Sequence, residues 1–318
     1  MKLKLLYITI WLGAFLGAEE LASFKPWYTG TIISLSGENT PAGKVNFNPY
    51  LMLTDYYGAY NSSWKSHKTD KFLSCVPFVI VEFGISDFFS VAFETSVFYN
   101  RCLSKDACQF GDFDLMLNFQ ILKQIPGEIR PSLRIMVDQL FPTGSYTRFS
   151  PYKAYSEWSS YGAFETTFSL LISKIVYWLK NHPVNWRFNL SYSFPAPCHV
   201  EGFNAYGGGF GTYGKAHLGN LLNCILTFEL SLNQRWVLAA DLFYQHSRRS
   251  SFHGISGTSL AGTPAALGFP ACDLIQIAPA LEYNFNADLG LFGGIVFSVE
   301  GRNISQFYTP TLALSYTF

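Results

Sequence analysis

Asp112 and Asp114 are the residues of this sequence best placed for acid–base chemistry. A single residue separates them in a segment of alternating apolar and polar residues, so in an extended strand both carboxylates lie on one face. Two carboxylates in one site can divide the roles of proton donor and acceptor. No Asp-x-His pair accompanies them, and His246 and Ser247 are adjacent rather than spaced to share a strand face. We therefore interpret both aspartates as lining a polar interior and expect no enzymatic activity.

Cysteines supply a second candidate site. Cys102 and Cys108 lie in one predicted loop, residues 101–111, of a chain that we expect to be exported, a setting in which disulfides persist. Their spacing predicts a small loop disulfide, with two free thiols as the alternative. The six histidines occur without an HExxH motif, a CxxC motif or a paired-histidine helix, so we expect no metal site and no cofactor.

The composition excludes an ordinary charged protein surface. Aromatic residues make up 18% of the 318 residues and charged residues only 14%, whereas typical soluble domains have about 25% charged residues. The formal net charge is zero, from 22 basic and 22 acidic residues. This balance removes the electrostatic basis for nucleic-acid binding.

The first residues have the pattern of a secretory signal. Lys2 and Lys4 precede an apolar run over residues 5–16, and small residues follow at 17 and 18. About 12 apolar residues are too few to cross a bilayer as a helix, so we predict a signal peptide over residues 1–18. An uncleaved anchor is the alternative. Residues 19–45 are predicted to form a periplasmic or lumenal extension. No later stretch of 18 uninterrupted apolar residues occurs, which disfavours a helical membrane protein.

From residue 46 to residue 318 the sequence alternates between apolar and polar residues with a period of two. This pattern predicts twelve strands, each long enough for a tilted strand to cross a membrane. They cover residues 46–60, 72–85, 89–100, 112–124, 129–141, 161–176, 184–194, 221–232, 235–246, 272–285, 288–301 and 305–318.

The connections between these strands alternate in length. Those after even-numbered strands are tight, whereas those after odd-numbered strands are long and polar, except for the last. The long connections are residues 61–71, 101–111, 142–160, 195–219 and 247–271. Short periplasmic turns and long extracellular loops are typical of outer-membrane barrels. We therefore predict an all-β, transmembrane, antiparallel up-and-down β-barrel over residues 46–318, in the outer membrane of a Gram-negative-type bacterium.

The alternation also assigns the charged residues to one face. If the apolar face contacts lipid, the other face lines the lumen, where water solvates charges that would be costly in a packed core. The predicted lumen-lining residues are Glu82, Glu94, Asp112, Asp114, Arg130, Arg134, Asp138, Glu165, Arg187, Glu229, Asp241, Glu282 and Glu300. This set is acidic overall and predicts a lumen that favours neutral or cationic solutes.

Five segments resemble a known family. They are residues 141–146 (FPTGSY), 206–214 (YGGGFGTYG), 232–241 (LNQRWVLAAD), 279–284 (PALEYN) and 297–303 (FSVEGRN). With them, the chain from about residue 26 to residue 318 resembles the bacterial outer-membrane β-barrel transporter family that is similar to the phenol-degradation meta-pathway outer-membrane proteins. The resemblance implies a single barrel that admits small, often hydrophobic or aromatic, molecules, and it brings no catalytic motif. It also implies that barrel-assembly machinery reads the C-terminal strand, residues 306–318, which ends in Phe318.

These features predict a channel or transporter for the passive uptake of small molecules, hydrophobic or aromatic ones included. Its expected partners are outer-membrane lipid, the small-molecule solute and the barrel-assembly machinery. We expect the loops at residues 142–160, 195–219 and 247–271 to fold inward as gates, with the N-terminal extension as a partial plug. The alternative is a structural or adhesive surface protein that acts through its extracellular loops.

Overall fold

The computed structural model describes residue 24 and residues 26–318, apart from residues 127, 154 and 180. The predicted signal peptide, residues 1–18, lies outside the described residues. In the described part of the chain, no helix has the length and apolar character needed to cross a membrane.

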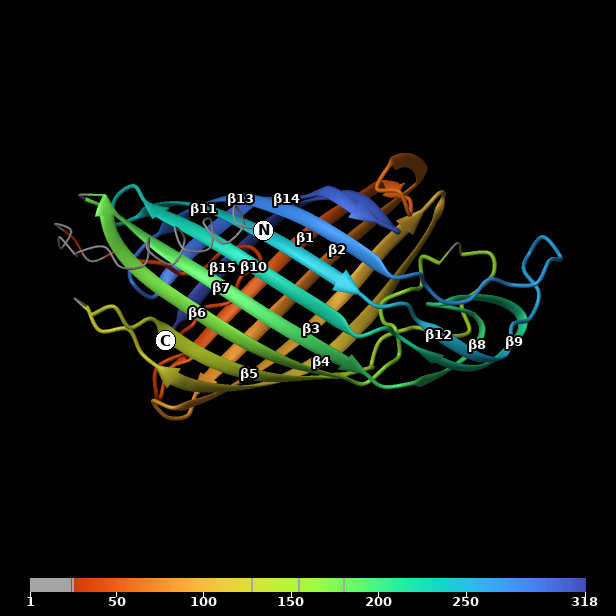
Figure 1. The fold of residues 1–318 in the computed structure, drawn as a ribbon, viewed down its shortest axis with the longest axis horizontal. Coiled ribbons are helices and arrows are strands. Elements are labelled where there is room, and N and C mark those ends of the chain that lie inside the picture. The colour runs from red at the N-terminus through yellow and green to blue at the C-terminus, as the bar shows by residue number, and fades with distance from the viewer. Residues whose placement is uncertain (1–23, 25, 127, 154, 180) are drawn as a thin grey trace, which may run out of the picture.

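Twelve strands of the described chain close into an antiparallel barrel (Figure 1). They are β1 (Val45–Tyr60), β2 (Ser66–Gly84), β3 (Phe89–Cys102), β4 (Lys105–Leu122), β5 (Ser132–Phe141), β6 (Glu165–Leu179), β7 (His182–Pro195), β10 (Leu221–Ser231), β11 (Trp236–Ser247), β13 (Cys272–Asn284), β14 (Leu289–Arg302) and β15 (Ile304–Thr317). At the seam between β1 and β15, Val45 and Phe318 exchange two backbone hydrogen bonds of 2.9 Å. The predicted all-β, twelve-stranded antiparallel barrel is confirmed.

The outside of the barrel is apolar and exposed. On β11, Leu238 and Leu242 are 44% and 50% exposed, whereas Val237 and Asp241, on the other face, are 0% and 1% exposed. Such a surface would be an aggregation hazard in water. It suits hydrocarbon, because a closed barrel pairs the backbone groups of its strands without help from solvent. The exterior therefore indicates a barrel that spans a membrane.

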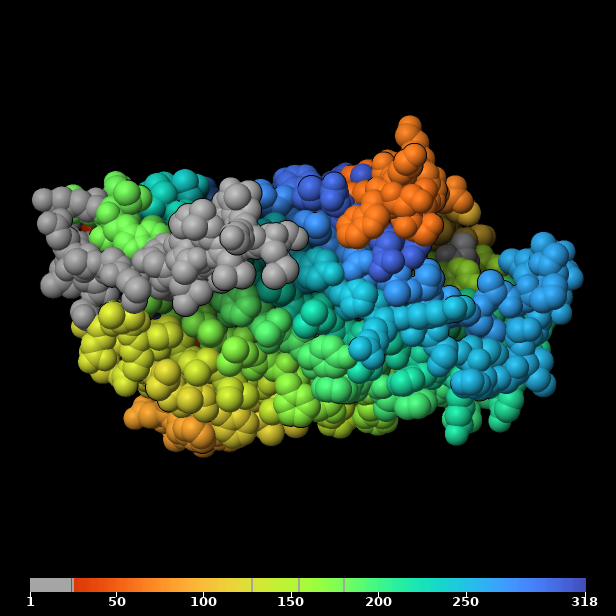
Figure 2. Space-filling view, in the orientation of Figure 1, coloured from red at the N-terminus to blue at the C-terminus, as the bar shows by residue number. Residues whose placement is uncertain are grey.

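A second, three-stranded sheet projects from one end of the barrel. Its strands are β8 (Cys198–Asn204), β9 (Gly207–His217) and β12 (Ser251–Ile255), in the order β12-β9-β8. It lies beyond the ends of β7 and β10, away from the end where β1 begins and β15 finishes (Figure 1). Side chains of these strands and of residues 248–271, coloured teal to light blue, fill this end of the molecule in Figure 2. We call it the extracellular end. Two of the predicted loops therefore contain strands.

The structure corrects two other predicted loops, residues 61–71 and 101–111. β2 already begins at Ser66 and β4 at Lys105, so the connections are tall hairpins. In the β3–β4 hairpin, Cys102 pairs with Lys105, which leaves a two-residue turn in which Leu103 has a φ of 56°. Residues 66–71 (SHKTDK) are polar on both faces, and residues 105–111 mix charged residues with small ones and with the exposed Phe110. The period-two signal is therefore lost although the strands continue.

The predicted Cys102–Cys108 disulfide is wrong. Cys102 pairs with Lys105 and Cys108 pairs with Tyr99, so the two cysteines lie in different rows of the hairpin. Alternate residues of a strand point to opposite faces, and this places the two thiols on opposite sides of the hairpin. A disulfide needs Cα atoms within about 7 Å and side chains that point toward each other. Both cysteines are free.

We expect Cys108, which is exposed, to react with a maleimide in detergent-solubilised protein without prior reduction, whereas the buried Cys198 resists modification. The adducts are counted by mass spectrometry. Cys108→Ser is expected to change the free energy of unfolding by less than about 0.5 kcal/mol, as surface substitutions usually do. A loss of about 2 kcal/mol or more, seen only without reductant, would instead indicate a disulfide.

Candidate functional site: the barrel lumen

An N-terminal stretch, which we call the lumenal segment (residues 29–40), runs inside the barrel. It forms no strand there, and side chains of the barrel wall accept hydrogen bonds from its backbone N–H groups. The donor–acceptor pairs are Thr29 to Glu282 Oε1 (2.5 Å), Ile33 to Asp241 Oδ2 (3.0 Å), Leu35 to Asn189 Oδ1 (2.8 Å), Asn39 to Gln120 Oε1 (2.7 Å) and Thr40 to Glu82 Oε1 (3.1 Å). Buried N–H groups need partners, and here carboxylates and amides supply them.

The apolar side chains of the lumenal segment fit between small inward-facing residues. Ile32 is 4% exposed and packs in a cluster with Ala278, Phe292 and Ala313. The segment passes close to the wall at Gly37. A Cβ at Gly37 would lie 2.6 Å from the backbone nitrogen of Ser173, so a larger residue would push the segment away from β6.

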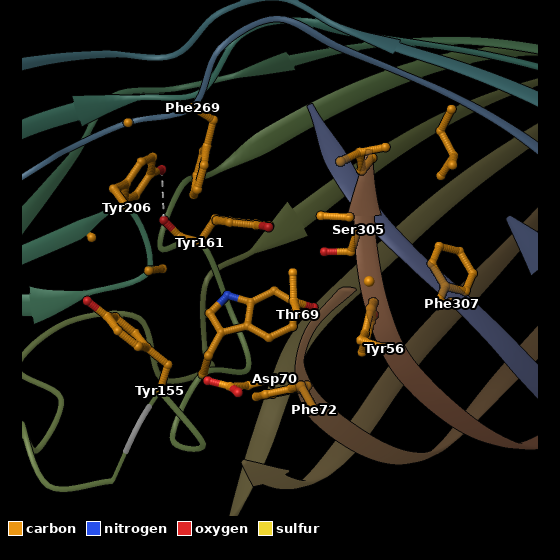
Figure 3. Close-up of a pocket in the computed structure, with 18 of the residues that line it drawn as sticks. Tyr56, Thr69, Asp70, Phe72, Tyr155, Tyr161, Tyr206, Phe269, Ser305 and Phe307 are labelled. Atoms are coloured by element: carbon orange, nitrogen blue, oxygen red, sulfur yellow. Dashed lines mark hydrogen bonds between the residues drawn. The ribbon is translucent and has the colours of Figure 1, made fainter. Parts of the chain in front are cut away.

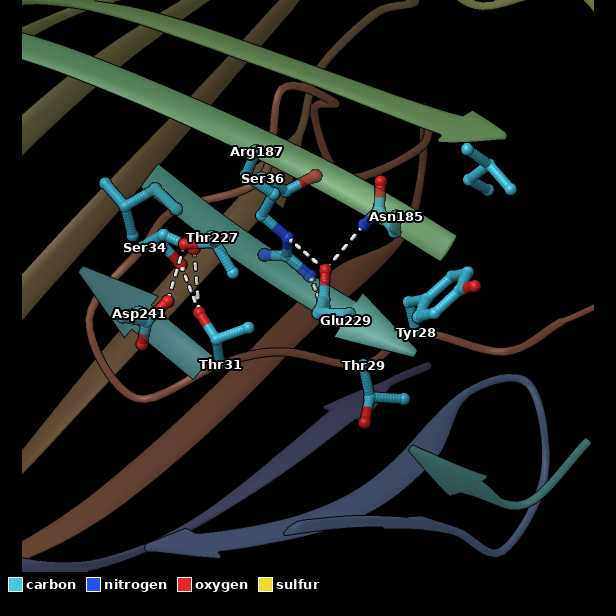
Figure 4. A network of polar contacts seen from close by, with 12 residues as sticks. Tyr28, Thr29, Thr31, Ser34, Ser36, Asn185, Arg187, Thr227, Glu229 and Asp241 are labelled. Atoms are coloured by element: carbon cyan, nitrogen blue, oxygen red, sulfur yellow. Dashed lines mark hydrogen bonds and ion pairs between the residues drawn. The ribbon is translucent and has the colours of Figure 1, made fainter. Parts of the chain in front are cut away.

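Both strand arginines predicted to line the lumen are paired with glutamates. Arg187 donates two hydrogen bonds to Glu229, from Nε to Oε2 at 2.7 Å and from Nη2 to Oε1 at 2.8 Å, and Asn185 donates to the same carboxylate at 2.6 Å (Figure 4). Arg134 lies 3.3 Å from Glu82. Pairing inside the barrel satisfies these charges without solvent. The two arginines therefore add no free positive charge to the lumen.

Four further carboxylates form what we call the acidic ladder: Glu94, Asp114, Asp138 and Glu165. Glu94 on β3 pairs directly with Asp114 on β4. Asp138 on β5 and Glu165 on β6 each lie diagonally across from the preceding member. Within the residues that the structure describes, none of the four forms an ion pair. The ladder gives one side of the lumen uncompensated carboxyl groups.

Asp112 does not act together with Asp114. It accepts a hydrogen bond of 2.9 Å from the backbone N–H of Gly144 and so anchors the segment that follows β5. Asp114 has Glu94 as its direct neighbour across the strands. No group of three or more His, Cys, Asp or Glu side chains in the described chain is arranged to hold a metal ion.

Two predicted lumen-lining residues are placed elsewhere. A register shift between β13 and β14 sets Glu300 opposite Ile275, whose side chain faces outward, so Glu300 is exposed on the outside of the barrel. Strict alternation could not anticipate this bulge, because an extra residue reverses the facing of those beyond it. Arg130 precedes β5 and lies 3.8 Å from Glu128 at the surface.

Sequence reasoning missed the neutral polar residues of the lumen. Asn189 and Gln120 are 3% and 6% exposed, and both form hydrogen bonds to the backbone of the lumenal segment, as the carboxylates do. Their signal was present in the sequence, because both occupy inward positions of their strands. The predicted lumen-lining set contained only charged residues, and it therefore left out neutral residues that contact the segment.

Two cavities lie between the lumenal segment and the extracellular end. The larger, which we call the mouth cavity, has a volume of about 800 Å³ and aromatic walls (Figure 3). The smaller, the inner cavity, has a volume of about 380 Å³; Ile32 and Ile33 of the lumenal segment line it, together with Glu94 of the acidic ladder. Tyr56 and Phe307 line both cavities, which therefore adjoin. A void of only about 100 Å³ continues beside the lumenal segment.

No protein-family model matches the sequence, and no curated protein does. Similarity appears among solved structures. A COG4313 outer membrane channel from Pseudomonas putida F1 aligns with a TM-score of 0.69 and 13% identity, covering 91% of this chain and 100% of that one. This chain has the fold of that channel. The family resemblance of the sequence is thereby confirmed at the level of fold.

Other barrels are more distant. A TodX deltaS2S3 mutant, a monoaromatic hydrocarbon channel, aligns with a TM-score of 0.43 and 14% identity, covering 87% of this chain and 90% of that one. The NanC porin aligns with a TM-score of 0.41 and 10% identity over 84% of this chain and 98% of that one.

Glu229→Gln tests the buried ion pair. The substitution keeps the volume but leaves the Arg187 charge without its partner, which we expect to lower the free energy of unfolding by about 3–5 kcal/mol. The measurement is denaturant unfolding in detergent micelles, followed by tryptophan fluorescence. The control is Glu300→Gln on the outer surface, which is expected to change the free energy by less than about 0.5 kcal/mol. Similar losses in both variants would contradict the assignment.

Proposed function

We propose that the protein is an outer-membrane channel for the passive uptake of small neutral or cationic molecules, hydrophobic and aromatic ones included. The observation that supports this proposal is a series of voids that decrease in volume from the extracellular end inward. The series narrows from the mouth cavity of about 800 Å³ to the inner cavity of about 380 Å³, and then to the void of about 100 Å³ beside the lumenal segment. Solute enters at the extracellular end and descends toward the periplasm.

The lumenal segment is the gate in this proposal. It takes no part in the barrel's strand ladder, and five of its backbone N–H groups bond to individual side chains of the wall, such as Asp241 and Asn189. Water can replace those acceptors one by one when the segment shifts. The barrel itself stays closed, because its own hydrogen bonds are untouched. Movement of the segment would therefore open the narrow part of the pathway at modest cost.

The acidic ladder sets the charge preference. Its carboxyl groups lie on one side of the lumen without ion-pair partners, whereas Arg134 and Arg187 are neutralised by glutamates. A passage lined by one sign of charge raises the local concentration of the opposite sign. The pathway therefore favours cations over anions. For its assembly, we propose that the barrel-assembly machinery reads β15 and the terminal Phe318.

Deleting residues 29–40 tests the gate. We expect the conductance of the purified protein in planar bilayers to rise several-fold, because the residues that block the lumen are gone while the strands are intact. Compact mobility on an unheated gel checks that the barrel still folds. Unchanged conductance would rule out the segment as the gate. If neither form passes ions or swells solute-loaded liposomes, the channel proposal fails and the surface-protein alternative gains support.

Neutralising the acidic ladder tests the charge preference. In a salt gradient, the unaltered protein is expected to show a reversal potential of cation-selective sign. The triple substitution Glu94→Gln, Asp114→Asn and Asp138→Asn should move that potential toward zero, because neutral amides of the same volume replace three carboxyl groups. Glu300→Gln, on the outside of the barrel, is the matched control and should change nothing. An unshifted potential in the triple variant would exclude the ladder as the selectivity element.

A further inference from the structure

The walls of the mouth cavity consist of two groups of aromatic rings. The roof group comes from residues between strands: Tyr161 lies 5.4 Å from Trp158 and 6.0 Å from Phe269, measured between ring centroids. The wall group comes from the barrel: Tyr56 lies 5.5 Å from Phe307 and 5.8 Å from Phe72. Figure 3 shows Tyr161 and Phe269 on one side and Tyr56 and Phe307 on the other. Ring faces and edges therefore surround the space from two sides.

The roof group is held in place by hydrogen bonds. The Tyr161 carbonyl accepts from the Tyr206 hydroxyl at 2.9 Å, and Tyr206 is only 1% exposed. Asn100 of β3 donates to the Trp158 carbonyl at 2.5 Å, which ties the roof to the barrel wall. Both bonds fix the backbone that carries the rings, and a site whose backbone is fixed before binding loses less conformational entropy when a ligand enters. The cavity is therefore a prepared site rather than a gap between mobile loops.

The charge around this path has a single sign. Asp70 lines the mouth cavity and Glu94 the inner cavity, and no Lys, Arg or His is among the described residues that line either one. Lys71, the neighbour of Asp70 in sequence, lies 3.9 Å from Asp55 instead. Burial raises the pKa of Tyr161 to about 12, so its hydroxyl stays neutral and adds no charge of its own. Aromatic faces attract cations through the ring quadrupole, and a carboxylate adds to that attraction.

We propose that the mouth cavity binds organic cations, namely amines or quaternary ammonium groups carried on a small aromatic or apolar body. Uptake of these cations rests on the proposed channel function, whereas their binding at the mouth does not. The ring faces and Asp70 hold the charged group, and the remaining apolar wall accommodates the body. The acidic ladder is the next negative element along the path. Neutral molecules of the same shape gain only the apolar contact, and anions are repelled.

The test measures the binding of three ligands of similar shape to the purified full-length protein in detergent micelles. Titration into empty micelles gives the reference. The ligands are 4-hydroxyphenyltrimethylammonium, its neutral isostere 4-tert-butylphenol, and the anion 4-hydroxybenzoate. Calorimetric titration should show the cation binding about tenfold more tightly than the isostere, with no measurable binding of the anion. Equal affinity for the cation and its isostere would overturn the inference and leave the channel proposal standing.

Two variants locate the site. Trp158→Leu and Asp70→Asn should each weaken binding of the cation by about three- to tenfold, with little change for 4-tert-butylphenol. Asp70→Asn keeps the test decisive if the tryptophan variant fails to fold. Trp236→Leu, on the exposed outer surface near the opposite end, is the control and should bind normally. Unchanged affinity in both site variants would overturn the inference. Binding of the cation without its uptake into liposomes would instead overturn the channel proposal.

Discussion

Lipid hydrocarbon offers no hydrogen-bond partner, and the arrangement of this chain follows from that constraint. The barrel must close on itself, and the bonds between Val45 and Phe318 complete it where the first strand meets the last. Closure assigns alternate residues to lipid and to the lumen. The outer face can then be uniformly apolar, while every group that needs a polar partner has to find it inside.

The carboxylates inside the barrel fall into two groups, one that binds the lumenal segment and one that forms the acidic ladder. Glu82, Asp241 and Glu282 accept hydrogen bonds from the backbone of the lumenal segment, which has no strand partner of its own. The acidic ladder forms no ion pair in the described chain, and its member Glu94 lines the inner cavity. One inner face thus both fastens the segment and gives the passage its charge. The same residue type serves both tasks because a carboxylate accepts hydrogen bonds as readily as it attracts cations.

The extracellular end is built by different means, because water is available there. The β1–β2 and β3–β4 hairpins are long, and the sheet of β8, β9 and β12 projects beyond this end of the barrel. Aromatic residues at this end, such as Tyr56 and Trp158, line the mouth cavity. Rings that face a cavity rather than lipid keep their faces free for a ligand.

The sequence by itself determined the class of fold, the number of barrel strands and the facing of most residues. Period-two alternation is a local property of each strand, and lipid requires an apolar residue at nearly every outward position. The sequence put Asp241 and Glu229 on the face opposite Leu238 and Leu230. Only the tertiary structure decided which groups meet. The pairing of Arg187 with Glu229 depends on the register of β7 against β10, and the outward facing of Glu300 depends on a bulge. The separation of Cys102 from Cys108 depends on a turn of two residues, and the insertion of the lumenal segment depends on acceptors far away in the chain. Alternation along a strand is local, whereas register and partners arise between segments that the sequence holds apart.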